Sequence, residues 1–169
     1  MAFTSNHDEN SWKGSEFDRY GKSARTFAVL CGLIKGMPLV YSGQEAGMNK
    51  VLRFFDKDTI EWKASDFREI YTKLNNLKSV NKALWNGNYG GEMVMINSDK
   101  EKSVYAFTRE KDRNKIVAIF NLSPDEVEFN LESNSLAGKY KNLFSGKPVF
   151  LTIKESMKLK PWGYLVYYK

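Results

Sequence analysis

The chain has a single cysteine and a single histidine among its 169 residues. One cysteine cannot form an intrachain disulfide, and the apolar neighbours of Cys31 in residues 29–34 favour a core side chain over a nucleophile. One histidine and one cysteine are also too few for a zinc site built from these ligands. The sequence therefore predicts no intrachain disulfide, no zinc site and a core position for Cys31.

Long apolar runs and clusters of basic residues are lacking as well. The chain has no run of about eighteen apolar residues and no charged segment followed by an apolar one at its start, so we expect no membrane partner and find no signal peptide. The 26 Lys and Arg residues exceed the 20 Asp and Glu residues, giving a net charge of +6. They are spread along the chain, whereas nucleic-acid binding requires clustered charge, so we expect no nucleic-acid partner.

Apolar residues are plentiful, at 42% of the chain, with aromatic residues at 14%. This composition suffices for one substantial hydrophobic core or two small ones. The segment Asn86–Gly91 is rich in glycine and asparagine, and the spacing of apolar residues changes after it. We therefore predict two domains, comprising residues 1–87 and 88–169.

The first domain has an α/β pattern. We expect a short strand at residues 2–5, a polar loop at 6–15, a helix at 16–35 and a second strand at 37–42. Strand, helix and strand in this order predict a right-handed crossover between parallel strands. A further amphipathic helix is predicted at 65–79.

The second domain has alternating apolar and polar residues, which are typical of β-strands. Eight strands are predicted, separated by turn residues, at 92–96, 103–110, 115–121, 126–131, 139–144, 149–153, 156–160 and 163–168. Short strands joined by turns favour an all-β antiparallel sandwich.

Four segments, in the same order along the chain, resemble motifs of one enzyme family. They are Phe3–Asp8 (FTSNHD), Gly36–Glu45 (GMPLVYSGQE), Phe54–Trp62 (FFDKDTIEW) and Leu159–Tyr167 (LKPWGYLVY). On these motifs the chain resembles the C-terminal part of an α-amylase-family glycoside hydrolase. The resemblance implies a partial TIM barrel containing the last two βα units, followed by the family's C-terminal β-sandwich.

The resemblance also implies a substrate and site residues. Family members are retaining enzymes that act on α-1,4-glucans such as starch and maltooligosaccharides. Asp8 matches the carboxylate that stabilises the transition state, and His7 matches a histidine that binds the same sugar. Trp12 follows them closely, and its indole could stack on a sugar ring. No cofactor is implied, although a structural calcium in the parent enzyme is left open, and the parent is expected to be secreted or periplasmic.

Carboxylates outside the Phe3–Asp8 motif are candidates for a general acid or for metal ligands. Glu45 follows the second predicted strand, where a general acid could lie, but the family does not use this residue, so a structural role is favoured. Asp56 and Asp58 lie in a loop with Arg53 and Lys57 nearby, and local ion pairing is favoured over metal binding.

The family's nucleophile and acid/base precede the Phe3–Asp8 motif, and no residue of this chain matches them. We therefore expect the chain alone to be inactive and its incomplete barrel to drive self-association. Two alternatives stay open. The sandwich could be a non-catalytic carbohydrate-binding or interaction module, or the parent could be a related α-glucan transferase or isomerase.

Overall fold

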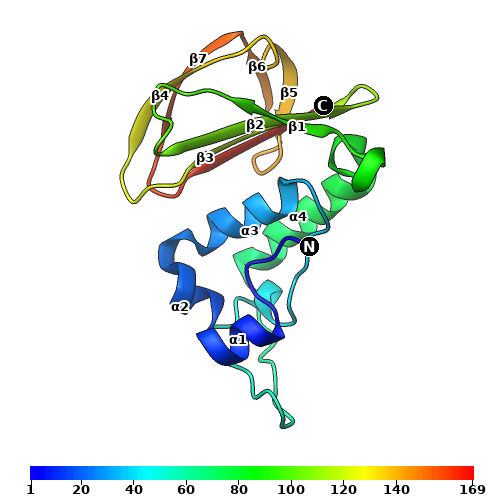
Figure 1. The fold of residues 1–169 in the computed structure, drawn as a ribbon, viewed down its shortest axis with the longest axis vertical. Helices are drawn as coiled ribbons and strands as arrows, with labels where there is room; N and C mark the ends of the chain where they lie inside the picture. The colour runs from blue at the N-terminus through cyan, green and yellow to red at the C-terminus, as the bar shows by residue number, and fades with distance from the viewer. The chain divides into compact units, whose positions relative to one another are not determined.

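The structure, a computed structural model, describes residues 1–169 (Figure 1). The chain consists of two compact units, Met1–Asn76 and Leu77–Lys169. The division falls within a helix, whereas the sequence predicts a domain boundary at residues 87 and 88, where the spacing of apolar residues changes. No helix is long and apolar enough to cross a membrane.

The first unit is mainly helical. Its helical segments are α1 (His7–Lys13), α2 (Glu16–Tyr20), η1 (Gly21–Ser23), α3 (Ala24–Leu33), η2 (Gln44–Ala46) and the greater part of α4 (Asp66–Val80). The predicted loop at 6–15 is wrong, because α1 fills most of it. The single helix predicted at 16–35 is also wrong: Gly21, with φ +51° and ψ −125°, ends α2, and a 3₁₀ turn precedes α3.

The two strands predicted in this unit are reduced to one parallel bridge, between Ala2 and Pro38. The Ala2 amide donates to the Met37 carbonyl over 2.8 Å, and the Leu39 amide donates to the Ala2 carbonyl over 2.9 Å. The predicted parallel direction is therefore found, but two short segments without further neighbours form too few ladder hydrogen bonds to make a sheet.

Helices α3 and α4 pack closely in the core of the first unit. Ala24 and Ala28 of α3 form a buried cluster with Phe67 and Tyr71 of α4. A Cβ on Gly32 of α3 would lie 2.9 Å from a Leu74 methyl group, so glycine is needed for this approach. Small residues on α3 thus allow α4 to lie against it.

The second unit is an antiparallel β-sandwich, as predicted. Its strands are β1 (Glu92–Ile96), β2 (Val104–Lys111), β3 (Asn114–Asn121), β4 (Val127–Glu132), β5 (Gly138–Asn142), β6 (Pro148–Leu151), β7 (Lys154–Leu159) and β8 (Tyr164–Tyr168). The 3₁₀ turns η3 (Lys82–Leu84) and η4 (Gly87–Tyr89) precede them. All eight predicted strands are confirmed, with ends that agree to within about two residues.

The strands form two sheets, of order β1-β2-β3-β8-β5-β6 and β4-β7. Every named strand pairing is antiparallel. The larger sheet contributes Val117 and Ile119 of β3 to the core between the sheets, and the smaller sheet contributes Phe129 and Leu131 of β4. These residues alternate along their strands, as expected when one face of a strand faces a core.

Candidate functional site

His7 and Asp8 are the first two residues of α1. The side chain of Asn6 caps this helix by accepting a hydrogen bond of 2.8 Å from the Glu9 amide. His7 Nε2 lies 3.5 Å from Asp8 Oδ2, and the two side chains are 65% and 61% exposed. The structure therefore brings these two predicted site residues together at a solvent-facing helix end.

Charged side chains fix the start of α1. The Glu9 carboxylate accepts hydrogen bonds from Lys13 over 3.0 Å and from Arg19 over 3.1 Å. Arg19 also donates to the Thr4 carbonyl over 2.6 Å and to the Gly14 carbonyl over 3.3 Å. The Arg19 side chain is 17% exposed, so this network is better shielded from water than a surface ion pair.

The first unit also contains a buried polar cluster of Thr4, Glu16 and Gln44. The Glu16 carboxylate accepts hydrogen bonds from the Thr4 hydroxyl, over 2.9 Å, and from the Gln44 amide. Its other oxygen has no hydrogen-bond partner, and burial raises the pKa of the Glu16 carboxyl above its ordinary value. Because Gln44 also accepts from the Tyr41 amide over 2.7 Å, the cluster joins the ends of the two segments that were predicted as strands.

Asn10 and Ser11 attach α1 to the segment that follows η2. The buried Asn10 side chain accepts from the Leu52 amide over 2.7 Å and donates to the Lys50 carbonyl over 3.0 Å. The Ser11 hydroxyl donates to the Leu52 carbonyl over 3.1 Å. These bonds hold Lys50 and Leu52 beside α1, shortly before Phe54 and Phe55 in the sequence.

Four rings meet beside the helix. The Phe54 ring centroid lies 5.8 Å from that of His7 and 5.4 Å from that of Trp12. The Phe55 ring lies 4.8 Å from Phe54 and 6.5 Å from Trp12. We call His7, Trp12, Phe54 and Phe55 the aromatic surface. Phe54 thus bridges two predicted site residues, a role that the sequence reading missed although an aromatic pair in a charged loop is an unusual feature.

The loop carrying the two phenylalanines is closed by Asp58. Its carboxylate accepts from the Lys50 ammonium, from the Arg53 amide over 3.1 Å and from the Thr59 amide over 2.7 Å. These hydrogen bonds, that of Lys50 foremost, hold the pKa of Asp58 well below its usual range. The predicted ion pairing of Asp58 is confirmed, but its partner is Lys50 and not one of the cations expected from the sequence, Arg53 and Lys57.

Glu45 is not among the residues that contact the aromatic surface. Its carboxylate accepts from the Gly43 amide over 3.0 Å, within its own turn. This contact supports the structural role predicted for Glu45. No cluster of three or more histidine, cysteine or carboxylate side chains in the chain could hold a metal ion.

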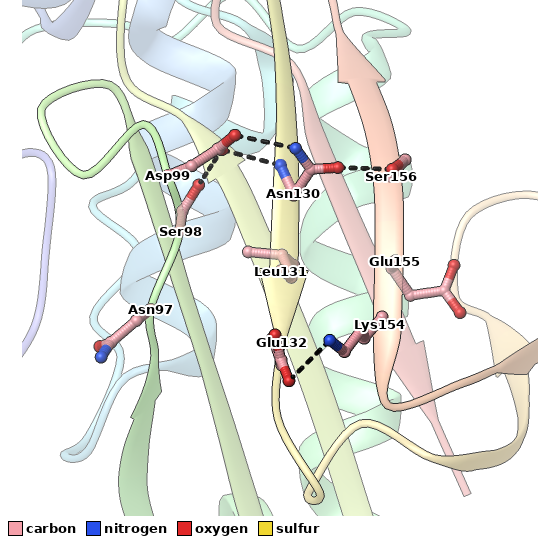
Figure 2. A pocket seen from close by; sticks show the side chains of 9 residues that line it. All are labelled: Asn97, Ser98, Asp99, Asn130, Leu131, Glu132, Lys154, Glu155 and Ser156. Atoms are coloured by element: carbon pink, nitrogen blue, oxygen red, sulfur yellow. Dashed lines mark hydrogen bonds and ion pairs between the residues drawn. The ribbon is translucent and has the colours of Figure 1, made fainter.

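The sandwich has a groove of about 630 Å³ on the smaller sheet (Figure 2). Figure 2 shows Asp99, Asn130 and Ser156 joined in a row. Asp99 accepts from the Asn130 backbone and side-chain amides, each over 2.8 Å, and Asn130 accepts from the Ser156 hydroxyl. The groove is lined by Asn97, Ser98, Asp99, Asn130, Leu131, Glu132, Lys154, Glu155 and Ser156.

The two surfaces differ in what they offer to a ligand. The groove is lined by polar and charged residues and Leu131, has no aromatic ring, and its central side chains already bond to one another. The aromatic surface combines exposed rings, the His7 imidazole among them, with the neighbouring Asp8 carboxylate. Because it presents large exposed apolar faces next to polar groups, the aromatic surface is the stronger candidate.

A family model matches part of this sequence, and solved structures match the fold. Residues 93–166 match the family model of the maltogenic amylase C-terminal domain. A noncanonic maltogenic α-amylase from Thermotoga neapolitana superposes with a TM-score of 0.80 at 19% identity, over 99% of this chain and 40% of that one. A cyclomaltodextrin glucanotransferase with a three-domain ABC distribution gives 0.72 at 15% identity, over 99% and 36%.

A third solved structure holds a sugar. The protein AmyP in complex with maltose superposes with a TM-score of 0.63 at 15% identity, over 93% of this chain and 35% of that one. Among curated proteins, no sequence matches. The chain spans about two fifths of the length of the solved structures that it resembles.

Proposed function

From the premise that this chain resembles the C-terminal part of an α-amylase-family glycoside hydrolase, we propose that it forms part of a retaining enzyme acting on α-1,4-glucans. Starch and maltooligosaccharides are the proposed substrates. The observation that carries the proposal is the placement of His7 and Asp8, side by side and exposed at the start of α1. Their motif precedes a domain that matches a maltogenic amylase family model.

Asp8 and His7 bind the sugar at the cleavage site in this proposal. An ionised carboxylate only accepts hydrogen bonds, so Asp8 takes them from sugar hydroxyls. These bonds strengthen as positive charge develops at the anomeric carbon, which stabilises the transition state more than the bound substrate. His7 binds the same sugar, and Trp12 provides an apolar wall beside it.

The first domain, residues 1–87, forms the last two βα units of a (β/α)₈ barrel in this proposal, and residues 88–169 form the C-terminal sandwich. Support comes from the parallel bridge between Ala2 and Pro38 and from the order of the helices. The nucleophile and the acid/base belong to preceding barrel segments. A retaining mechanism requires both, so this chain supplies only the part that binds the sugar.

Sugar binding to the 169-residue chain provides the test. On addition of maltotriose, we expect saturable NMR shifts at His7 and at the Trp12 indole, with no release of reducing ends from starch. Asp8→Asn should weaken binding, because it removes the charged acceptor. The exposed Asp125→Asn change in the sandwich serves as the matched control. Turnover by the chain alone, or equal binding by the Asp8 variant, would contradict the proposal.

A carbohydrate-binding sandwich is the second candidate function, favoured by the polar groove of Figure 2. Saturable shifts at Asp99, Asn130 and Ser156 without a response at His7 would indicate this function. Glucan transfer is a third candidate for the reaction of the whole enzyme, since a cyclomaltodextrin glucanotransferase shares the fold. Fold alone does not separate hydrolysis from transfer.

A further inference from the structure

We propose that Asn86 is a site of spontaneous deamidation, in which the Gly87 amide nitrogen attacks the Asn86 side chain with the assistance of the Lys78 ammonium. All three residues belong to the second unit, where Lys78 lies on α4 and the other two lie in the connector before β1. Asn86 and Gly87 form the only Asn-Gly pair in the sequence. The inference is independent of the proposed function, because it concerns the covalent chemistry of the chain itself.

The reaction needs no reagent other than water. The Gly87 nitrogen loses its proton and bonds to Cγ of Asn86, which closes a succinimide ring. The bond from Cγ to Nδ2 breaks, and Nδ2 leaves as ammonia with the proton. Water then opens the ring at either carbonyl group, giving an aspartyl residue or an isoaspartyl residue whose main chain runs through Cγ. Because both reacting groups belong to the same segment, the first step is intramolecular.

Exposure and backbone conformation leave the attacking nitrogen accessible. Residues 85–89 are all exposed, so water reaches this turn. Gly87 has φ of +56°, and a Cβ built at this position would have no other atom within 4 Å. A residue without a side chain does not shield its own nitrogen, and the Gly87 amide donates no backbone hydrogen bond. The nucleophile of the reaction is therefore free to approach Cγ.

The Asn86 backbone has to rotate before the ring can close. With φ of −92° and ψ of 157° it is extended, so the Gly87 nitrogen points away from Cγ. The hydrogen bonds of η4 that oppose this rotation are long: the Tyr89 amide donates to the Asn86 carbonyl over 3.2 Å, and the Gly90 amide donates to the Gly87 carbonyl over 3.4 Å. Exposed backbone hydrogen bonds open locally at much lower cost than global unfolding. Ring closure therefore requires only this turn to open.

Lys78 stabilises the charge that develops during the attack. Its Nζ donates to Oδ1 of Asn86 over 2.9 Å and also to the Leu84 carbonyl, which anchors the ammonium beside the turn. Attack on Cγ places negative charge on Oδ1. A cationic donor already bonded to that oxygen is worth more as the charge grows, so it lowers the barrier. The carboxylate of the product keeps the same cation as a partner.

The isoaspartyl product lengthens the main chain inside a tightly held connector. Arg109 of β2 donates to the Trp85 carbonyl and to the Gly91 carbonyl, each over 3.0 Å. A Cβ on Gly90 would lie 1.8 Å from the Trp85 carbonyl oxygen, and one on Gly91 would lie 2.5 Å from the Glu110 carbonyl oxygen. An additional backbone carbon between these fixed points strains the connector. The isoaspartyl form should therefore unfold at a lower urea concentration than the aspartyl form.

Peptide mapping by mass spectrometry, after incubation of the 169-residue chain at neutral pH, tests the proposal. We expect the mass increase of deamidation at Asn86, with both products present, and slower conversion at the exposed Asn134, which precedes a serine. Lys78→Gln should slow the reaction at Asn86 about twofold to fivefold, the range for one exposed contact of a charged group. Lys78→Arg keeps a cationic donor and should retain most of the rate. Lys139→Gln, at an exposed lysine of β5, is the matched control and should leave the rate unchanged.

Incubation in concentrated urea separates the role of the fold from the reactivity of the Asn-Gly pair. In the unfolded chain, the natural protein and Lys78→Gln should deamidate at equal rates, because the contact with Asn86 is lost. If Asn86 stays intact in the folded chain over a time in which the unfolded chain converts, the site is overturned. Equal rates for the folded natural chain and the folded Lys78→Gln variant would overturn the assistance by Lys78, and the proposal with it.

Discussion

Glu16 is a carboxyl group in an unusual environment, because it is 2% exposed and one of its oxygens lacks a hydrogen-bond partner. Burial disfavours the charged form, so the pKa of Glu16 is raised even though Thr4 and Gln44 donate to the other oxygen. The cluster nevertheless joins the two segments of the parallel bridge. The effect of the Glu16 carboxylate on the free energy of unfolding therefore depends on pH.

The Glu16→Gln variant should reveal this effect. The folded-state pKa of Glu16 lies above the ordinary value of 4.5, so the folded chain binds the proton more tightly than the unfolded chain. The resulting stabilisation is complete below pH 4.5 and is lost as pH rises through the folded-state pKa. The free energy of unfolding of the variant, relative to the natural chain, should rise across this window.

Urea unfolding at a series of pH values measures that difference. Glu101→Gln, at an exposed carboxylate in the turn before β2, is the matched control, and its difference from the natural chain sets the baseline. A difference for Glu16→Gln that follows this baseline at every pH would show that Glu16 titrates alike in the folded and unfolded chains.

At the scale of elements, α1 shows what sequence reading missed. The motif Phe3–Asp8 predicts His7 and Asp8 as site residues, which stays a prediction, and the structure places both in the first turn of α1. The helix itself was missed because α1 is short and polar and lacks the apolar periodicity by which helices are recognised. Its stability comes instead from the Asn6 cap and from the Asn10 and Arg19 side chains. The contacts of Asn10 and Arg19 join distant parts of the sequence and leave no local pattern.

The sandwich was predictable for the opposite reason. Its strands alternate in burial, and turn residues separate them, so local pattern and tertiary structure agree. The turn between β2 and β3 places Asp112 and Arg113 at φ of 49° and 71°, the left-handed values that a two-residue hairpin requires. The position of Phe54 and Phe55 depends on Asn10 and Asp58, and therefore required the structure.

Removal of the α1 cap tests the link between this helix and the site. Asn6→Ala should lower the free energy of unfolding by about 1 kcal/mol, because the Glu9 amide loses its acceptor. It should also weaken maltotriose binding, because His7 and Asp8 lie in the first helical turn. Urea unfolding and NMR titration measure the two effects. Asn88→Ala, an exposed asparagine of η4, is the control, and an unaltered His7 titration in Asn6→Ala would argue against helix-based positioning.

At the scale of the whole chain, the two units differ in the number of strand pairings that they form and in the apolar side chains that they expose. In the second unit, eight strands pair in two sheets around a common core. The first unit has a single parallel bridge and exposes large apolar side chains, among them Met37, Phe55 and Trp62. Local stability follows burial and hydrogen bonding, so the sandwich should be the more stable unit.

We therefore predict that the 169-residue chain self-associates through its first unit. Light scattering should give a mass above 19.5 kDa that falls on dilution. Hydrogen exchange should find the amides of β2 and β3 strongly protected at every concentration, because their ladder bonds lie within the sandwich. The amides of residues 1–45 should exchange faster, and their protection should increase with concentration as association covers the exposed apolar surface. A monomeric mass combined with strong protection of residues 1–45 would mean that this unit is stable by itself.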